Sequence, residues 1–316
     1  MGILKRTYFK LKSIVIRNYS FVTFILIALS KRKNQVIYIC AYPLGDTCYA
    51  LAYRSHLLNR NNCKFYFAEG CRVMIENCFS DVIDNAAVVY YQKNSLLFKA
   101  INSALFCPWQ NHFFSKFGVK IIFPYAYFRP NREVTCDYFT ILKKNIFPFL
   151  PSNASIEFPL VPIVDINSID DFQKNKKRIV ILNPFSNSMC DDEKELWETI
   201  ADNLLFRGYI VYTNVMKHQK EIKDTKRLEC SIIELYNICN EIPLFVSVRS
   251  GIIDFTISST CNKIVIWYMD SRVSRESLKN ICNLDAWGIT NVYSIYHINK
   301  QDTMYSFNKY MECFAK

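Results

Sequence analysis

An arginine, a serine and a glycine stand where a strand-like apolar run meets a helix-like segment. The run is Leu244–Val248, and Arg249, Ser250 and Gly251 follow it directly. Glycine lets a ligand approach the backbone at a helix start, where the N–H groups have no partner inside the helix. The N–H groups of residues 251–253 would therefore form an anion site whose charge Arg249 reinforces. This pattern predicts that a diphosphate binds here.

A structural interpretation of the same residues stays open. Gly251 would cap the helix, Asp254 would be the first-turn acid that complements the helix dipole, and Arg249 would pair with a neighbouring carboxylate. The sequence favours the structural role for Asp254 and contact with a ligand for Arg249.

Polar residues also follow other apolar runs of the second half. In open α/β sheets, ligands bind beyond the carboxyl ends of the strands. The further candidate binding residues at such positions are Asn183, Ser186, Thr213, Asn214 and Lys217. The phosphate loops GxxxxGK[ST] and GxGxxG are absent, and no Asp-x-Asp pair stands at a strand end to hold a divalent metal. We therefore expect phosphate binding by separate polar groups and no metal.

In the first half, Gly45 and Asp46 occupy the loop after the first predicted strand. A carboxylate at this position could act as a general base on a hydroxyl group within hydrogen-bond reach. Alternatively, Asp46 is the N-cap of a helix that begins near Thr47.

Strand-like runs alternate with helix-like segments along most of the chain, which predicts parallel sheets covered by helices. The predicted strands are 35–41, 63–68, 86–91, 119–123, 178–182, 209–213, 244–248 and 263–268. The predicted helices are 47–58, 71–79, 191–206, 231–239, 251–259 and 303–314. We expect an α/β protein with two Rossmann-like βαβ domains that face a cleft, preceded by a basic N-terminal helix.

Four prolines between residues 147 and 162, followed by a polar stretch, mark the boundary between the two domains. The expected parts are a basic amphipathic segment over 1–34, one domain over 35–160 and a second over 161–316.

The thirteen cysteines are odd in number and irregularly spaced, and none forms a CxxC pair. They indicate buried thiols of a cytosolic protein rather than a disulfide framework or zinc ligands. The four histidines, including His297, stand apart from one another without a metal-type partner at helical or hairpin spacing.

Residues 1–33 carry eight basic residues and no acid, and they enclose the apolar run 21–29. Nine residues are too few to cross a bilayer, which needs about 20. A signal peptide is disfavoured because the run ends in Ser30-Lys31-Arg32-Lys33 without a small-residue cleavage pattern. We prefer an interfacial helix on anionic lipid, with a helix packed on the protein body as the alternative. The basic residues belong to no recognisable module for nucleic acid, so no nucleic-acid partner is expected.

Several motifs of the second half resemble bacterial GT-B glycosyltransferases that build lipopolysaccharide, O-antigen and capsule. The motifs are Asn183-Pro184 before a Trp-bearing helix, Gly208-Tyr209-x-Val211-Tyr212-Thr213-Asn214, and Ser247-Val248-Arg249-Ser250-Gly251-x-x-Asp254. The Gly45-Asp46 loop is similar to the acceptor-domain loop of heptosyltransferases. Asp254 stands where heptosyltransferases usually carry a histidine, so the resemblance does not indicate a heptose donor.

The resemblance implies an acceptor domain in the first half and a nucleotide-sugar donor domain in the second. Asp46 would deprotonate the acceptor, while Arg249, the helix start at Gly251 and Lys217 would stabilise the leaving nucleoside diphosphate. The resemblance implies no metal, because these residues take the task of stabilising the leaving group. It implies no cofactor either, because the nucleotide sugar is a substrate. The expected place is the cytoplasmic face of the inner membrane, with a lipid-linked or oligosaccharide acceptor. A sugar- or nucleotide-binding protein without catalysis and a sugar-nucleotide epimerase remain the alternatives.

Overall fold

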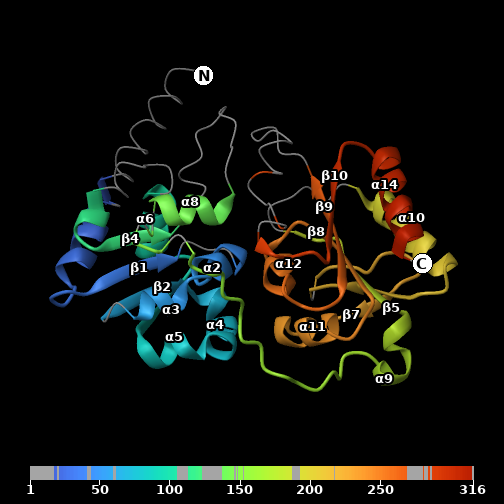
Figure 1. The fold of residues 1–316 in the computed structure, drawn as a ribbon, viewed down its shortest axis with the longest axis horizontal. Coiled ribbons are helices and arrows are strands. Elements are labelled where there is room, and N and C mark those ends of the chain that lie inside the picture. Colours follow the sequence, from blue (N-terminus) through green and yellow to red (C-terminus); the bar gives the residue numbers. More distant parts are fainter. Residues whose placement is uncertain are drawn as a thin grey trace. The chain divides into compact units, whose positions relative to one another are not determined.

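The computed structural model describes residues 18–19, 21–40, 44–59, 62–104, 113–122, 137–145, 147, 149–151, 153–186, 193–216, 218–268, 280, 284 and 287–314. The chain divides into two compact units, Met1–Leu160 and Val161–Lys316 (Figure 1). The division falls where the sequence places the boundary between the two halves.

The first unit is built on a four-stranded parallel sheet. Its strands are β1 (Val36–Cys40), β2 (Cys63–Ala68), β3 (Ala87–Tyr91) and β4 (Val119–Ile122), in the order β3-β2-β1-β4. The central strand β1 pairs with β2 on one side and with β4 on the other, and four of its five residues are buried. All four strands that the sequence predicts in this half are present.

The helices of the first unit depart from the prediction in number. They are α2 (Leu44–Ala50), α3 (Arg54–Leu58), α4 (Arg72–Cys78), α5 (Ser80–Asn85), α6 (Leu96–Ala104) and α8 (Tyr138–Asn145), with the 3-10 turn η1 (Glu69–Cys71) and helical residues 21–29 and 113–116. The single helix expected over 47–58 is wrong, because the chain turns at residues 51–53 and forms α2 and α3. The sequence also missed α5, whose Ser, Asp and Asn residues favour turns over helices.

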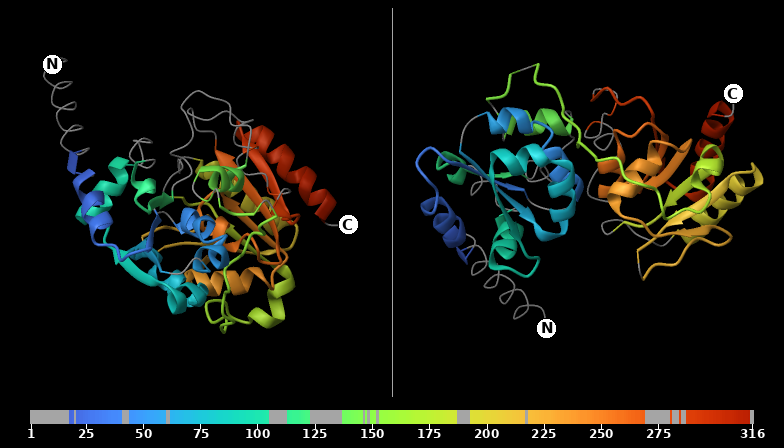
Figure 2. Two further views of the ribbon diagram at one scale, coloured as in Figure 1. Left: turned by 60° about the vertical axis from the view of Figure 1, so that its left-hand side comes forward. Right: turned by 90° about the horizontal axis from the view of Figure 1, so that it is seen from below.

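The described part of the N-terminal segment packs on the first unit. Helix 21–29 lies against the first unit (Figure 2). Its Phe24 and Ile27 are buried, and they share a hydrophobic cluster with Ile101 of α6 and with Phe114. The ring of Phe114 lies 5.3 Å from the ring of Phe24. The alternative expectation, a helix packed on the protein body, therefore holds for one face of this helix.

The second unit contains a six-stranded parallel sheet. Its strands are β5 (Ile179–Asn183), β6 (Ile210–Asn214), β7 (Lys226–Leu228), β8 (Leu244–Val248), β9 (Asn262–Tyr268) and β10 (Val292–His297), in the order β10-β9-β8-β5-β6-β7. The strands β7 and β10 at the two edges were not predicted. Every residue of β5 and β8 is buried, as expected for central parallel strands covered on both faces.

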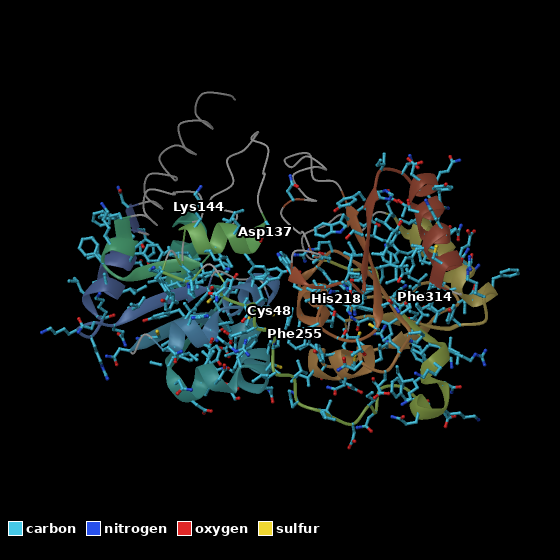
Figure 3. All side chains as sticks on the ribbon, in the orientation of Figure 1. Cys48, Asp137, Lys144, His218, Phe255 and Phe314 are labelled. Carbon is cyan, nitrogen blue, oxygen red and sulfur yellow. The ribbon has the colours of Figure 1, made fainter. Side chains whose placement is uncertain are left out.

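Helices cover both faces of this sheet. They are α9 (Phe172–Asn175), α10 (Lys194–Phe206), α11 (Ile232–Cys239), α12 (Gly251–Thr256) and α14 (Lys300–Phe314), with the 3-10 turn η3 (Lys176–Arg178). The helices α10 and α14 pack on one face in one hydrophobic cluster, and α9, α11 and α12 pack on the other face in a second cluster (Figures 1 and 2). On the second face lies Phe255 of α12, which is labelled in Figure 3. Its ring centroid is 5.7 Å from that of Tyr236 in α11.

The end of α10 shows why the sequence predicts this helix well. Gly208 has a φ of 84°, a left-handed conformation that glycine adopts without strain. The N–H of Gly208 bonds the carbonyl of Leu205, and the N–H of Tyr209 bonds that of Leu204. These two bonds form the Schellman motif, which ends a helix and turns the chain into the next strand.

Nine of the thirteen cysteines lie in the described residues, and all nine are free thiols. Seven of them are buried, whereas Cys230 is half-buried and Cys313 is exposed. Burial raises the pKa of Cys78 to about 11 and is the main cause that raises the pKa of Cys230 to about 12. The expectation of buried thiols is confirmed for this part of the chain.

Candidate functional site

Three neighbouring strands of the second unit end in polar side chains that touch one another. The Nδ2 of Asn214, at the end of β6, donates to the Oδ1 of Asn183, at the end of β5, at 2.9 Å. The Nδ2 of Asn183 donates to the Oγ of Ser247 in β8 at 2.9 Å and lies 3.5 Å from the Oγ of Ser250. We call these four residues the asparagine cluster. The structure thus brings together three predicted site residues, Asn183, Asn214 and Ser250.

The asparagine cluster is buried at its centre, so its hydrogen bonds are required for stability. Asn183 is 1% exposed and Ser247 is 0% exposed, and a buried polar group without a partner costs about 1–3 kcal/mol. The Oγ of Ser247 in turn donates to the carbonyl of Val248 at 2.7 Å. Because the chain leaves the sheet just after Asn183, Asn214 and Ser247, the cluster fixes the start of three loops at the carboxyl edge, where open α/β sheets bind ligands.

Ser247 was not among the predicted site residues, although it belongs to the motif that carries the resemblance. A signal for it exists in the sequence, because it is the one polar residue of the strand Leu244–Val248. A serine at such a position requires a buried hydrogen-bond partner, and Asn183 supplies it.

Arg249 is held by the acid that the sequence offers five residues later. Its Nη1 lies 2.6 Å from the Oδ2 of Asp254 and also donates to the carbonyl of Ser250 at 3.0 Å. Asp254 is 5% exposed, and the side chain of Arg249 is 13% exposed. The guanidinium also lies 5.2 Å from the ring centre of Trp267, a cation–π distance. The structure therefore shows the pairing that the sequence left as the alternative for Arg249, and the structural role favoured for Asp254.

The helix start at Gly251 differs in one respect from the expected anion site. α12 begins at Gly251, as predicted, with Ser250 in extended conformation before it. However, the N–H of Ile253 donates to the carbonyl of Ser250 at 3.1 Å. The expectation that the N–H groups of 251–253 are all free is therefore wrong, because the helix closes its first turn on Ser250.

Thr213 serves the fold of its own loop. It is fully buried, and its Oγ1 lies 2.6 Å from the Oγ1 of Thr225 and accepts the N–H of Ile222 at 3.2 Å. These bonds fold the chain after β6 back onto the strand. Of the other predicted residues, Ser186 is half-buried at the end of a described stretch, and Lys217 lies outside the described residues.

In the first unit, the predicted Gly45-Asp46 loop is part of a helix. α2 begins at Leu44, three residues before the expected start, and Gly45 is buried. Asp46 is thus the third residue of α2 rather than its N-cap, a first-turn position that favours an acid through the helix dipole. The carboxylate of Asp46 lies outside the described side chains.

His297 has an acidic partner that the sequence did not suggest. Its Nε2 lies 2.7 Å from Glu193, which precedes α10, and its Nδ1 lies 2.8 Å from the Oγ1 of Thr303 in α14. The ring also packs on Tyr268, at a centroid distance of 4.9 Å. Glu193 is 104 residues away in sequence, so only the fold brings it to His297. Within the described residues, no three His, Cys, Asp or Glu side chains gather as metal ligands.

A buried lysine lies at the other end of β9, away from the asparagine cluster. Lys263 is 0% exposed, and its Nζ donates to the carbonyls of Ser259 and Cys261 at 2.6 and 2.8 Å. Burial lowers the pKa of Lys263. A hydrogen bond from Cys239, helped by the charge of Lys263, lowers the pKa of Cys261 to about 7. This cluster ties α11 to β9.

No protein-family model matches the chain, and no curated protein sequence matches it. Among solved structures, the chain is similar to a family 9 glycosyl transferase from Veillonella parvula, with a TM-score of 0.53 and 13% identity over 88% of this chain and 89% of the other. It is similar to the E. coli ADP-heptose lps heptosyltransferase II, with a TM-score of 0.53 and 11% identity over 89% of this chain and 100% of the other. It is also similar to the E. coli heptosyltransferase WaaC with ADP, with a TM-score of 0.52 and 10% identity over 89% of this chain and 100% of the other. These likenesses, together with the two parallel sheets, confirm the expected α/β fold of the GT-B class.

Proposed function

We propose that the chain is a glycosyltransferase that moves a sugar from a nucleoside-diphosphate sugar to a cell-surface glycan acceptor. The acceptor class would be lipopolysaccharide, O-antigen or capsule, reached from the cytoplasmic face of the inner membrane. The observation that carries the proposal is the likeness of fold along about nine-tenths of the chain to structures described as glycosyltransferases, one of them with ADP. The asparagine cluster supports it by placing buried, ordered polar groups at the edge where such folds bind ligands.

The roles of individual residues in this reaction belong to the proposal. Asp46 would accept the proton of the acceptor hydroxyl, and Arg249 with Lys217 would stabilise the departing diphosphate. Arg249 would act in the orientation that Asp254 imposes, since a paired guanidinium keeps its charge while its rotamer is fixed. Asn183, Asn214 and Ser250 would position the loops against the donor. No metal would take part.

The experiment is a transfer assay with a panel of nucleotide sugars and glycan acceptors, in the presence and absence of EDTA. Asp46→Asn and Arg249→Ala are each expected to lower the rate by about 10²–10⁴-fold, the contribution typical of acid–base and charge-stabilising groups. Asn214→Ala is expected to weaken donor binding, with Asn203→Ala on the side of α10 as a matched control, since Asn203 bonds Asn308 instead.

Three outcomes would contradict the proposal. Undiminished transfer by both Asp46→Asn and Arg249→Ala would remove the assigned roles. Consumption of the donor at the same rate without any acceptor would indicate an epimerase. Donor binding without turnover across the panel would indicate a binding protein.

A further inference from the structure

The helix 21–29 presents a second apolar face, whose side chains are exposed. Val22, Leu26 and Leu29 are 53%, 61% and 76% exposed. Their spacing of four and three residues places all three on one side of the helix. An exposed row of large aliphatic side chains in one line differs from scattered surface residues and marks an interaction site.

The opposite face of the helix fixes this row in place. Phe24 is fully buried and Ile27 is 9% exposed, and the ring of Phe21 lies 5.3 Å from that of Phe114. Because these contacts hold the helix on the body of the first unit, the exposed row does not depend on the helix folding on contact with a partner.

Two aromatic residues from a distant part of the sequence extend the row. The ring of Phe113 lies 5.6 Å from that of Phe21 and 5.0 Å from that of Phe117. Phe113 is 38% exposed and Phe117 is 51% exposed. We call the five exposed residues Val22, Leu26, Leu29, Phe113 and Phe117 the apolar strip.

Basic residues border the apolar strip. Lys31 follows the helix, and its Nζ donates to the carbonyl of Phe117 at 2.7 Å, which joins the two segments that form the strip. Arg32, Lys33 and Lys116 are exposed beside them.

The segments that build this region contain no acid. In the described residues 18–19, 21–40, 85–104 and 113–122 there is no Asp or Glu, and these residues carry Lys31, Arg32, Lys33, Lys93, Lys99, Lys116 and Lys120. In a chain that holds 28 acidic residues in all, this local excess of positive charge favours binding to a surface of opposite charge.

We propose that the apolar strip and its basic border dock the first unit on an anionic phospholipid surface. Aliphatic and aromatic side chains enter the boundary between headgroups and acyl chains, while lysine and arginine bind the headgroup phosphates. A second copy of the chain would place this positive charge against itself, and nucleic acid offers no apolar layer for Leu26 and Leu29. Within the described residues, no helix is both long and apolar enough to span a membrane. This docking surface goes beyond the proposed transfer reaction and does not depend on it.

The test is co-sedimentation of the full chain with vesicles of phosphatidylcholine alone or with about one-third phosphatidylglycerol, at low and high salt. The wild type is expected to bind the anionic vesicles at low salt, to bind neutral vesicles at least about tenfold less, and to lose binding as salt screens the charges. Leu26→Gln/Leu29→Gln is expected to lower the partition coefficient by about tenfold or more. Arg32→Gln/Lys33→Gln is expected to lower it by about fivefold for each charge removed.

Matched controls come from the second unit. Ile163→Gln/Phe206→Gln removes two apolar side chains that are each 94% exposed, and Lys194→Gln/Lys223→Gln removes two lysines that are 76% and 75% exposed. Both controls are expected to bind vesicles as the wild type does. The proposal is overturned if the wild type does not bind anionic vesicles. It is also overturned if Leu26→Gln/Leu29→Gln and Arg32→Gln/Lys33→Gln each bind vesicles as well as their matched controls do. It is overturned equally if light scattering shows that Leu26→Gln/Leu29→Gln only converts a dimer to a monomer while vesicle binding is unchanged.

Discussion

Replacing one partner of the Arg249–Asp254 ion pair is expected to destabilise the second unit strongly. The two charged atoms lie 2.6 Å apart, with Asp254 5% exposed and Arg249 13% exposed. Once its partner is gone, either charge remains in a site that water hardly reaches. The perturbations are Asp254→Asn, Arg249→Met and the double substitution.

The magnitude follows from burial. Removing one partner of a buried ion pair costs about 3–5 kcal/mol, because the other charge is left without compensation. Arg249 retains some solvent and the carbonyl of Ser250, so Asp254→Asn is expected to cost about 3 kcal/mol. Arg249→Met leaves the more buried carboxylate and is expected to cost about 4 kcal/mol. The double variant removes both charges of the pair and leaves only an amide to be satisfied, so its loss is expected to be about 1–3 kcal/mol, well below the sum of the single losses.

The assay is urea unfolding followed by tryptophan fluorescence. Three of the four tryptophans, Trp197, Trp267 and Trp287, belong to the second unit, so the fluorescence reports mainly its unfolding. An exposed pair in the same unit gives the control: Lys176 and Glu241 are also 2.6 Å apart, but their side chains are 27% and 43% exposed. Lys176→Met is expected to cost about 1 kcal/mol or less.

Two results would refute this reasoning. One is a loss of unfolding free energy in the double variant that equals the sum of the losses in the two single variants, since the two charges would then be independent. The other is a loss for Asp254→Asn no larger than that for Lys176→Met, since burial would then not decide the cost. The double variant has a further use, because donor binding measured in it separates the contact of Arg249 with a ligand from its part in the fold.

Arg54→Ala is expected to destabilise the first unit by about 1.5–3 kcal/mol, the range of a hydrogen bond to a charged group, because Arg54 is 4% exposed and its Nε lies 2.7 Å from Asp81, which keeps 32% exposure. Circular dichroism during urea unfolding checks this, and a loss below about 1 kcal/mol would contradict it. Lys263→Met is expected to change the free energy of unfolding by less than about 1.5 kcal/mol, because Asn291 also donates to both carbonyls that Lys263 bonds. Urea unfolding checks this, and a loss above about 3 kcal/mol would show that the buried ammonium itself is required. The folded state raises the pKa of Cys230 from 9.0 to about 12, so its contribution to stability is complete below about pH 9 and is lost as the pH rises towards about 12. Thermal unfolding between pH 8 and pH 11 is therefore expected to show a smaller alkaline loss for Cys230→Ser than for the wild type or for Cys313→Ser, and equal losses would contradict the assignment.

The sequence predicted the parts of the fold in which local pattern and packing agree. The central strands β5 and β8 are apolar throughout and sit between turn signals, so they were placed within one residue. α10 was found because its apolar face and the terminal Gly208 both indicate a helix. The edge strands β7 and β10 were missed, because β7 has only three residues and β10 (VYSIYH) shows neither a continuous apolar run nor a strict alternation of apolar and polar residues.

The candidate site was predicted in its location more than in its contacts. That Asn183, Asn214 and Ser250 gather follows from the rule that parallel strands end at one edge of a sheet. That Asn183 bonds Ser247, or that His297 bonds Glu193, depends on strand order and register, which a single sequence does not reveal. The position of Asp46 was predicted wrongly, because α2 begins three residues earlier than expected and Asp46 lies in the helix rather than in the loop before it.

The central proposal is that the second unit binds a nucleoside diphosphate at the carboxyl edge of its sheet, in loops that the asparagine cluster positions. Its most direct measurement is isothermal titration of the full chain with ADP, UDP, GDP and CDP, and with Asn214→Ala and the control Asn203→Ala. We predict that the wild type and Asn203→Ala bind one of these nucleotides with the same dissociation constant, and that Asn214→Ala binds it about tenfold more weakly, which corresponds to about 1.4 kcal/mol. Absence of binding for all four nucleotides, or equal affinity in all three proteins, would contradict the claim.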